Sequence, residues 1–94
     1  MGFRDKAKAA KTAEIEIDGE VLTIREPTYA LSVEANKLEP AKGMAKLFIA
    51  CVYQDGAPVW TEAQIDEVLN LPVSYAKQLD AAIGQLAAVP PKKS

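Results

Sequence analysis

The sequence predicts a small α+β domain in which an N-terminal β-hairpin packs on a mostly helical body of about four helices. Apolar and polar residues alternate over residues 13–25, which is the strand period, whereas later apolar residues recur at the helical period. The 94 residues, of which 49% are hydrophobic and 26% charged, suffice for one small core. We therefore predict a single α+β domain over residues 12–89, between a basic flexible arm over 1–11 and a flexible tail over 90–94.

The hairpin is predicted by the alternating segment and by the dipeptide at its centre. Asp18 and Gly19 both tolerate positive φ, which a two-residue type I′ turn requires. The second strand should end before Pro27, because proline has no backbone N–H to donate. One face of the hairpin is then apolar and the other acidic. The expected pairs on the apolar face are Ala13 with Ile24 and Ile15 with Leu22.

Four helices are predicted after the hairpin. Thr28 caps the first at Tyr29, the second opens after Pro40, Thr61 caps the third and Pro72 precedes the fourth. Each has an apolar stripe at helical spacing. The four stripes comprise Leu31, Ala35 and Leu38; Met44, Leu47, Phe48, Cys51 and Val52; Ile65, Val68 and Leu69; and Tyr75, Leu79, Ala82, Ile83 and Leu86.

The hairpin also needs a partner, because a two-stranded hairpin alone is marginally stable in water. The second helix has the most complete stripe, so we expect the apolar hairpin face to pack on residues 44–52. Between the second and third helices, Asp55-Gly56 predicts a turn and residues 58–60 a brief extended piece.

The residue types weigh against an enzyme. The chain contains no histidine, so it cannot by itself build His-based triads, Cys–His dyads or the usual His-bearing zinc sites. Its one cysteine, Cys51, lies on an apolar helix face and is expected in the core. The acids before Gly19 do not form a calcium loop, because Arg25 occupies the position of the bidentate glutamate. We predict a non-enzymatic protein with no catalytic residues, no cofactor and no metal.

Charge and hydropathy indicate where the protein acts. The longest apolar run, residues 47–53, is far shorter than the roughly 18 to 20 residues that span a bilayer, and residues 1–11 lack the apolar stretch of a secretory signal. The formal net charge is −2, with an acidic body between basic ends, unlike the basic face that nucleic acids require. We expect a cytoplasmic protein without a membrane or nucleic-acid partner.

Two longer segments resemble a known family. Residues 17–28 (IDGEVLTIREPT) combine a hairpin turn, a strand and an Arg-Glu-Pro segment before a helix. Residues 49–61 (IACVYQDGAPVWT) end a helix, turn at Asp-Gly, and reach an aromatic residue before a capped helix. Together with the helices around them, these segments resemble the small tail assembly chaperones of long-tailed bacteriophages, over about 80 residues.

The resemblance implies a function as well as a fold. Such a chaperone binds the tape measure protein, keeps that long helical chain soluble and helps recruit tail tube subunits. It acts in the cytoplasm of the bacterial host, from a phage or prophage genome, and is absent from the mature virion. The family often makes a second, longer product by programmed frameshifting near the end of the short reading frame. The codons for Lys92 and Lys93 could provide such a slippery site.

Two other non-enzymatic functions fit the same residues: a small virion structural adaptor, and a regulatory protein-binding domain such as an antitoxin. Each requires an exposed apolar surface, and self-association remains open as well. Aromatic residues dominate protein interfaces, and the large side chains hardest to place in the core by periodicity are Tyr29, Val33, Trp60 and Tyr75. We predict these four as partner-binding residues. Each could instead cover a core edge, and Trp60 could pack on Ile65 as a helix staple.

Overall fold

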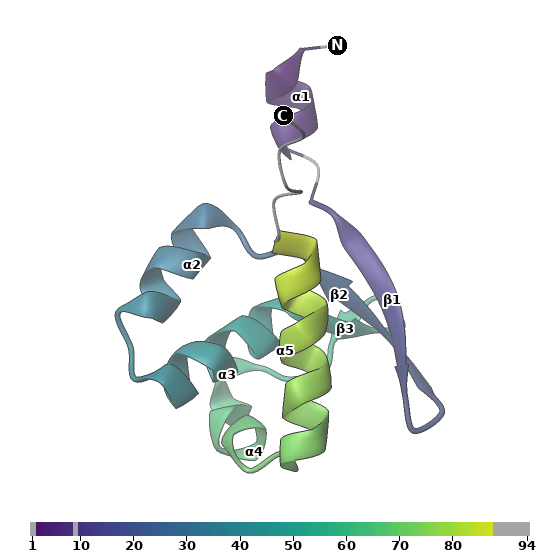
Figure 1. The fold of residues 1–94 in the computed structure, drawn as a ribbon, viewed down its shortest axis with the longest axis vertical. Coiled ribbons are helices and arrows are strands. Elements are labelled where there is room, and N and C mark those ends of the chain that lie inside the picture. Colours follow the sequence, from purple (N-terminus) through teal and green to yellow (C-terminus); the bar gives the residue numbers. More distant parts are fainter. Residues whose placement is uncertain (1, 9, 88–94) are drawn as a thin grey trace, which may run out of the picture.

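The computed structural model describes residues 2–8 and 10–87 and has the predicted α+β fold (Figure 1). All four predicted helices are present, and a further short helix lies within the predicted arm. None of the described helices has the length and apolar character needed to cross a membrane. The elements are α1 (Phe3–Lys8), β1 (Thr12–Ile17), β2 (Glu20–Arg25), α2 (Tyr29–Asn36), α3 (Pro40–Cys51), β3 (Val52–Gln54), β4 (Ala57–Pro58), the 3₁₀ helix η1 (Glu62–Gln64), α4 (Ile65–Leu69) and α5 (Val73–Ala87).

The first hairpin has the predicted register. β1 and β2 are antiparallel, and the pairs Ala13–Ile24 and Ile15–Leu22 lie opposite each other. The turn residues Asp18 and Gly19 have φ of 50° and 82°, as a type I′ turn requires.

A second hairpin extends this sheet and corrects the predicted end of the second helix. α3 ends at Cys51, and Val52 starts β3, where it pairs with Ile24 of β2. Asp55 and Gly56 repeat the positive φ values of the first turn, at 54° and 80°, and lead into β4. The predicted turn and extended piece are therefore parts of an antiparallel sheet with strand order β1-β2-β3-β4. Val52 leaves the helix because a fully buried β-branched side chain suits the sheet at this place.

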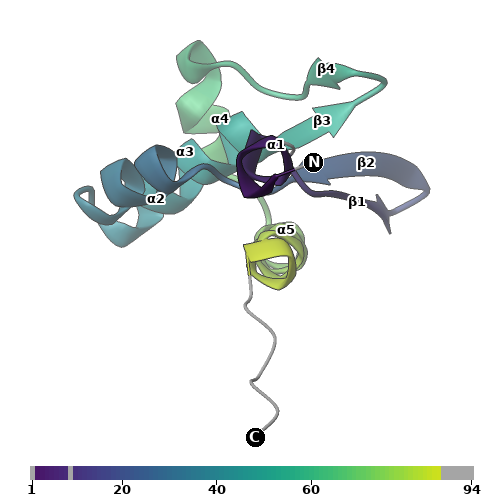
Figure 2. The same cartoon turned by 90° about the horizontal axis from the view of Figure 1, so that it is seen from above.

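The hairpin packs mainly on α5, and not on α3 as predicted. α5 lies across one face of β1 and β2 (Figure 2), whereas α3 contacts β2 but not the length of both strands. α5 is the longest helix and its stripe can cover the whole hairpin, while α3 is already packed against α2 and α4. The core beneath comprises Ile17, Ile24, Ala45, Phe48, Cys51, Val52, Trp60, Val68, Leu79, Ala82 and Ile83.

The predicted arm contains α1, which stands away from the rest of the domain (Figure 1). Phe3 on this helix is 82% exposed. The backbone N–H of Glu26 donates to the carbonyl of Lys11 (2.8 Å), which fixes the point where the arm leaves the sheet. The flexibility of the arm stays a prediction, and the predicted tail over 90–94 lies outside the described residues.

Candidate partner-binding surface

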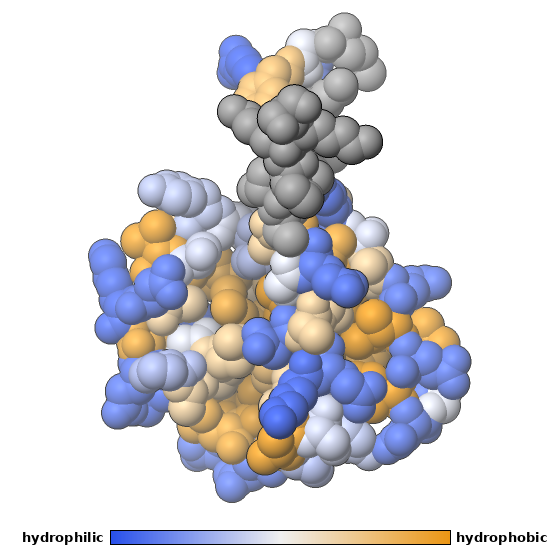
Figure 3. Space-filling model, viewed as in Figure 1, coloured by the Kyte–Doolittle hydropathy of each residue, from blue (hydrophilic) through white to orange (hydrophobic). Residues whose placement is uncertain are grey.

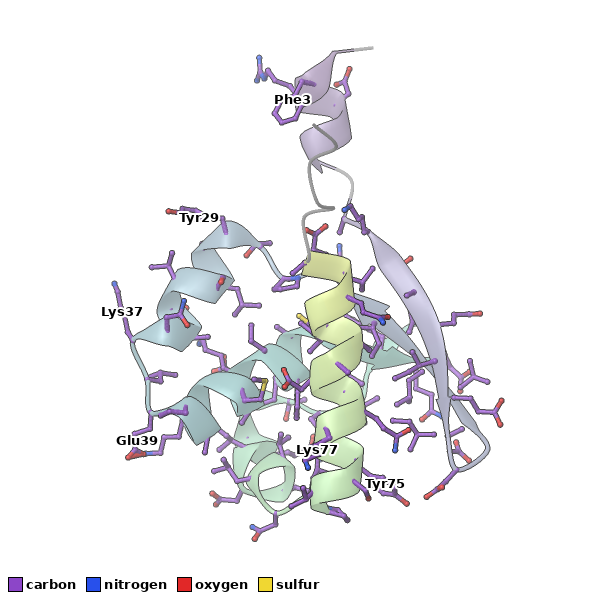
Figure 4. All side chains as sticks on the ribbon, viewed as in Figure 1. Phe3, Tyr29, Lys37, Glu39, Tyr75 and Lys77 are labelled. Atoms are coloured by element: carbon purple, nitrogen blue, oxygen red, sulfur yellow. The ribbon has the colours of Figure 1, made fainter. Side chains whose placement is uncertain are left out.

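The four predicted partner-binding residues lie in two separate places. Tyr29 and Val33 belong to α2, while Trp60 and Tyr75 lie beside the hairpins. Tyr29 is 87% exposed and points away from α2 into solvent (Figure 4), whereas Val33 is half-buried. α2 and the hairpins are on different sides of α3 and α5 in Figure 1. The structure therefore does not bring the four residues together into one surface.

α2 presents Tyr29 from a firmly held position. The Thr28 hydroxyl accepts a hydrogen bond from the backbone N–H of Leu31 (3.1 Å), which caps the helix. α2 also approaches α3 closely, since a Cβ atom on Gly43 would lie 2.4 Å from the carbonyl oxygen of Ala35. Only glycine permits this contact. Tyr29 consequently sits on a helix whose opposite face is fixed against the domain.

Trp60 lies in the core and not on the surface. Its side chain is 8% exposed, and its indole Nε1–H donates to Glu67 Oε2 (2.9 Å). The hydrogen bond satisfies the only polar atom of the indole, so the large ring can be buried at little cost. This placement removes Trp60 from the exposed apolar anchors that the sequence suggested.

Trp60 and Tyr75 nevertheless line one groove, which we name the hairpin groove. The two hairpins pair only near Thr23 and Ile24, and beyond these residues they splay apart (Figure 2). The space between them, against α5, has a volume of about 200 Å³. Its lining comprises Ile17, Asp18, Glu20, Leu22, Gln54, Val59, Trp60, Leu71, Tyr75 and Leu79.

The rim of the hairpin groove is acidic. Asp18 and Glu20 lie on it, and none of the lining residues is Lys or Arg. The Tyr75 hydroxyl donates to the Asp18 carboxylate, and this hydrogen bond, together with the negative charge of Asp18, raises the pKa of Tyr75. Gln54 Nε2 donates to Glu20 Oε1 (2.7 Å), which links the two hairpins across the groove. The groove thus combines an apolar floor with negative charge at its edge.

A second groove, which we name the helical groove, was not predicted from the sequence. It lies between α3, α4 and α5 with a volume of about 300 Å³. Leu69 and Val73 stand at its rim with 39% and 68% of their side chains exposed. Figure 3 shows apolar surface beside α5 and over α3. The lining comprises Ala41, Met44, Ala45, Phe48, Val68, Leu69, Leu71, Val73, Ala76, Lys77 and Asp80.

The sequence contained one signal for this groove. Leu69 has a place in the apolar stripe of its helix, but Val73 lies outside the stripe that Tyr75 and Leu79 define on α5. Val73 is therefore an apolar residue that the periodicity of its helix does not place in the core. Lys77 and Asp80 are the charged residues of the lining, so the helical groove carries no net charge.

The one cysteine among the described residues, Cys51, is part of the core. Cys51 is 1% exposed, and burial raises its pKa to about 11, only partly offset by the positive charge of Arg25. A thiol in this state is not a nucleophile near neutral pH. Within residues 2–8 and 10–87, no three His, Cys, Asp or Glu side chains gather where they would hold a metal ion.

Comparison with solved structures finds the bacteriophage HK97 tail assembly chaperone, with a TM-score of 0.63 and 17% sequence identity. The match covers 79% of this chain and 83% of the HK97 chain. No protein-family model and no curated protein sequence matches the chain. At this identity the likeness establishes the fold alone, which this chain shares with the HK97 protein. The fold that the resemblance implied is confirmed.

Proposed function

We propose that this protein is a phage tail assembly chaperone that binds the tape measure protein and keeps it soluble. The observation that carries the proposal is the fold shared with the HK97 tail assembly chaperone across most of both chains. Two exposed apolar surfaces, the helical groove and α2, support the same function, because a chaperone of this kind acts by covering apolar segments of its client.

The helical groove is the better docking surface of the two. An amphipathic helix docks by laying its apolar stripe into a groove between other helices. Leu69 and Val73 at the rim and Met44 in the lining provide such a surface without a net charge to repel the client. Tyr29 and Val33 on α2 form a second contact for a long client, and Tyr75 beside the hairpins a third.

The finer parts of the function follow from the same proposal. The protein also helps recruit tail tube subunits to the tape measure protein, acts in the cytoplasm of the bacterial host and is absent from the finished virion. A longer product made by frameshifting would carry the same domain at its N-terminus. Quantitative mass spectrometry of purified tails tests whether the protein is absent from the finished virion. We expect none in the tails, and a fixed number of copies per tail would instead indicate a virion structural adaptor.

Co-expression with the tape measure protein of the same phage tests the binding function. The tape measure protein is expected in the soluble fraction, together with this chain, only when both are expressed. The double variant Leu69→Ser and Val73→Ser should lose most of this rescue. Val21→Ser is the matched control, since Val21 is 51% exposed but lies on β2, which contributes no residue to the lining of the groove.

Circular dichroism must show that each variant is folded, because all three side chains are partly exposed and their loss should not unfold the domain. If the wild-type chain rescues no tape measure protein, the proposed function is wrong. If the wild-type chain and the double variant rescue equally well, the function stands but the helical groove is not its site.

A further inference from the structure

We propose that the free edge of β1 binds an extended segment of another protein, in which lysine or arginine alternates with apolar residues. The segment would pair with β1 and add a strand to the sheet. The proposal goes beyond the chaperone function and does not depend on it. Three observations carry it: the open backbone of β1, a partly covered apolar row on one face of this strand, and an acidic row on the other.

β1 is a regular strand at the edge of the sheet. The strand order is β1-β2-β3-β4, and β1 pairs with β2 over all six of its residues without a bulge. The strand contains no proline, which would remove a donor from the edge. In Figure 2, β1 is the outermost strand on its side of the sheet. It therefore has the length and regularity that pairing with a further strand requires.

Alternate backbone groups of β1 point outward from the sheet. In an antiparallel pair, every second residue exchanges both of its hydrogen bonds with the partner strand. The two-residue turn places Ile17 in such a pair, and the bond from the Glu26 N–H to the Lys11 carbonyl continues the same odd-numbered set. The N–H and C=O groups of Glu14 and Glu16 consequently face away from β2. An added strand could bond to them directly.

The apolar face of β1 is only partly covered. Ala13, Ile15 and Ile17 share this face, on which α5 packs. Ala13 and Ile15 are half-buried, whereas Ile24, which lies opposite Ala13 on β2, is fully buried. Figure 3 shows apolar surface between α5 and the hairpin. Apolar residues at alternate positions of an added strand would cover this row.

The other face of β1 carries negative charge. Glu14 and Glu16 are exposed, and their cross-strand neighbours on β2, Thr23 and Val21, are uncharged. Within the described part of the chain, neither carboxylate takes part in an ion pair. The alternate side chains of an added strand would lie beside these carboxylates, where opposite charge is favoured. The partner strand should therefore carry lysine or arginine at these positions.

The same carboxylates disfavour a second copy of this chain as the added strand. Two β1 strands paired antiparallel would bring their acidic rows together on one face, and like charges side by side are destabilising. The chain's own arm is basic, but Arg4 and Lys6 belong to the helix α1 and not to an extended segment. The charge pattern thus selects a strand from another protein.

Amide exchange of the full chain, detected by NMR, tests this docking. The probe is a synthetic peptide of about nine residues in which lysine and valine alternate. At saturation it should slow the exchange of the Glu14 and Glu16 amides by about tenfold or more, because both then donate to the peptide. A peptide of the same composition, with its lysines and valines in two blocks, should bind about tenfold more weakly.

Charge reversal locates the site. Glu16→Lys should raise the dissociation constant of the lysine–valine peptide by about fivefold or more. Glu20→Lys is the matched control: it makes the same reversal on the same hairpin, but on the inner strand β2, and should change the constant by less than about twofold. The double variant Glu14→Lys and Glu16→Lys should instead prefer a glutamate–valine peptide. Circular dichroism should show every variant folded, since these side chains are exposed.

Three results would overturn the proposal. The first is no protection of the Glu14 and Glu16 amides by the lysine–valine peptide at up to about 1 mM. The second is equal binding of the two-block peptide, or equal weakening by Glu16→Lys and Glu20→Lys. The third is protection of the same amides that rises with protein concentration in the absence of peptide, which would assign the edge to a second copy.

Discussion

The Ile24 side chain is fully buried where β2 pairs with β3 and contacts α5, whereas Arg25 next to it on the strand is exposed. Ile24→Ala should lower the free energy of unfolding by about 2 to 5 kcal/mol, because it leaves a cavity in the core. Val21→Ala, at an exposed position on the same strand, should cost less than about 0.5 kcal/mol. Denaturant titration measures both. Equal losses would contradict the described orientation of the hairpin.

The buried Cys51 thiol links stability to pH. Its pKa is about 11 in the folded state, above the ordinary value of 9.0, so the unfolded chain loses the proton first as the pH rises. The contribution of this group is fully present below pH 9 and is lost between about pH 9 and 11. Denaturant titration should therefore show the wild type losing more stability than Cys51→Ala over that range. Identical pH profiles would show that the thiol is accessible to solvent.

Single residues also mark the limit of what the sequence predicts about the site. Tyr29 is exposed, because it follows a cap and lies off the apolar stripe of its helix, and its role as a partner-binding residue stays a prediction. Trp60 is buried instead. The fold brings the Glu67 carboxylate of α4 to the indole N–H of Trp60, and the sequence alone does not show this pairing. The sequence places Val73 off the core stripe of α5, but only the assembled helices show that it borders a groove.

Among the elements, the contact between α2 and α3 depends on one glycine. Gly43→Ala should destabilise the domain even though alanine favours helix, because the new methyl group would meet the Ala35 carbonyl in the backbone of α2. Gly84→Ala is the control on α5, where the added Cβ meets nothing within 4 Å and should stabilise the helix by about 0.5 to 1 kcal/mol. Thermal unfolding compares the two. Stabilisation by both would show that α2 does not approach α3 this closely.

The elements that the sequence predicted well are those with local signals. The first hairpin follows from alternation and one turn dipeptide, and the longer helices follow from an apolar stripe together with a cap or a proline at the start. β3 and β4 have three and two residues, too few for alternation to be recognised, and β3 depends on the pairing of Val52 with Ile24, 28 positions away. Which of two amphipathic helices covers the hairpin is likewise decided by tertiary packing.

At the scale of the whole molecule, the arm is separate from the core. Deleting residues 2–10 should change the thermal midpoint at low protein concentration by less than about 2 °C, because α1 stands clear of the domain (Figure 1). The deletion keeps Lys11 and its hydrogen bond to Glu26. Circular dichroism gives the midpoint. A fall of more than about 5 °C would mean that the arm packs as part of the fold.

The central claim is that the helical groove holds a helical segment of the tape measure protein, and hydrogen–deuterium exchange of the chain with and without that protein tests it most directly. Slower exchange in the complex is predicted at the helix ends that border the groove, in α4 and at the start of α5. β1, whose outer face lies away from the groove, should exchange as before. No change in α4 and α5, or protection confined to β1, would contradict the claim.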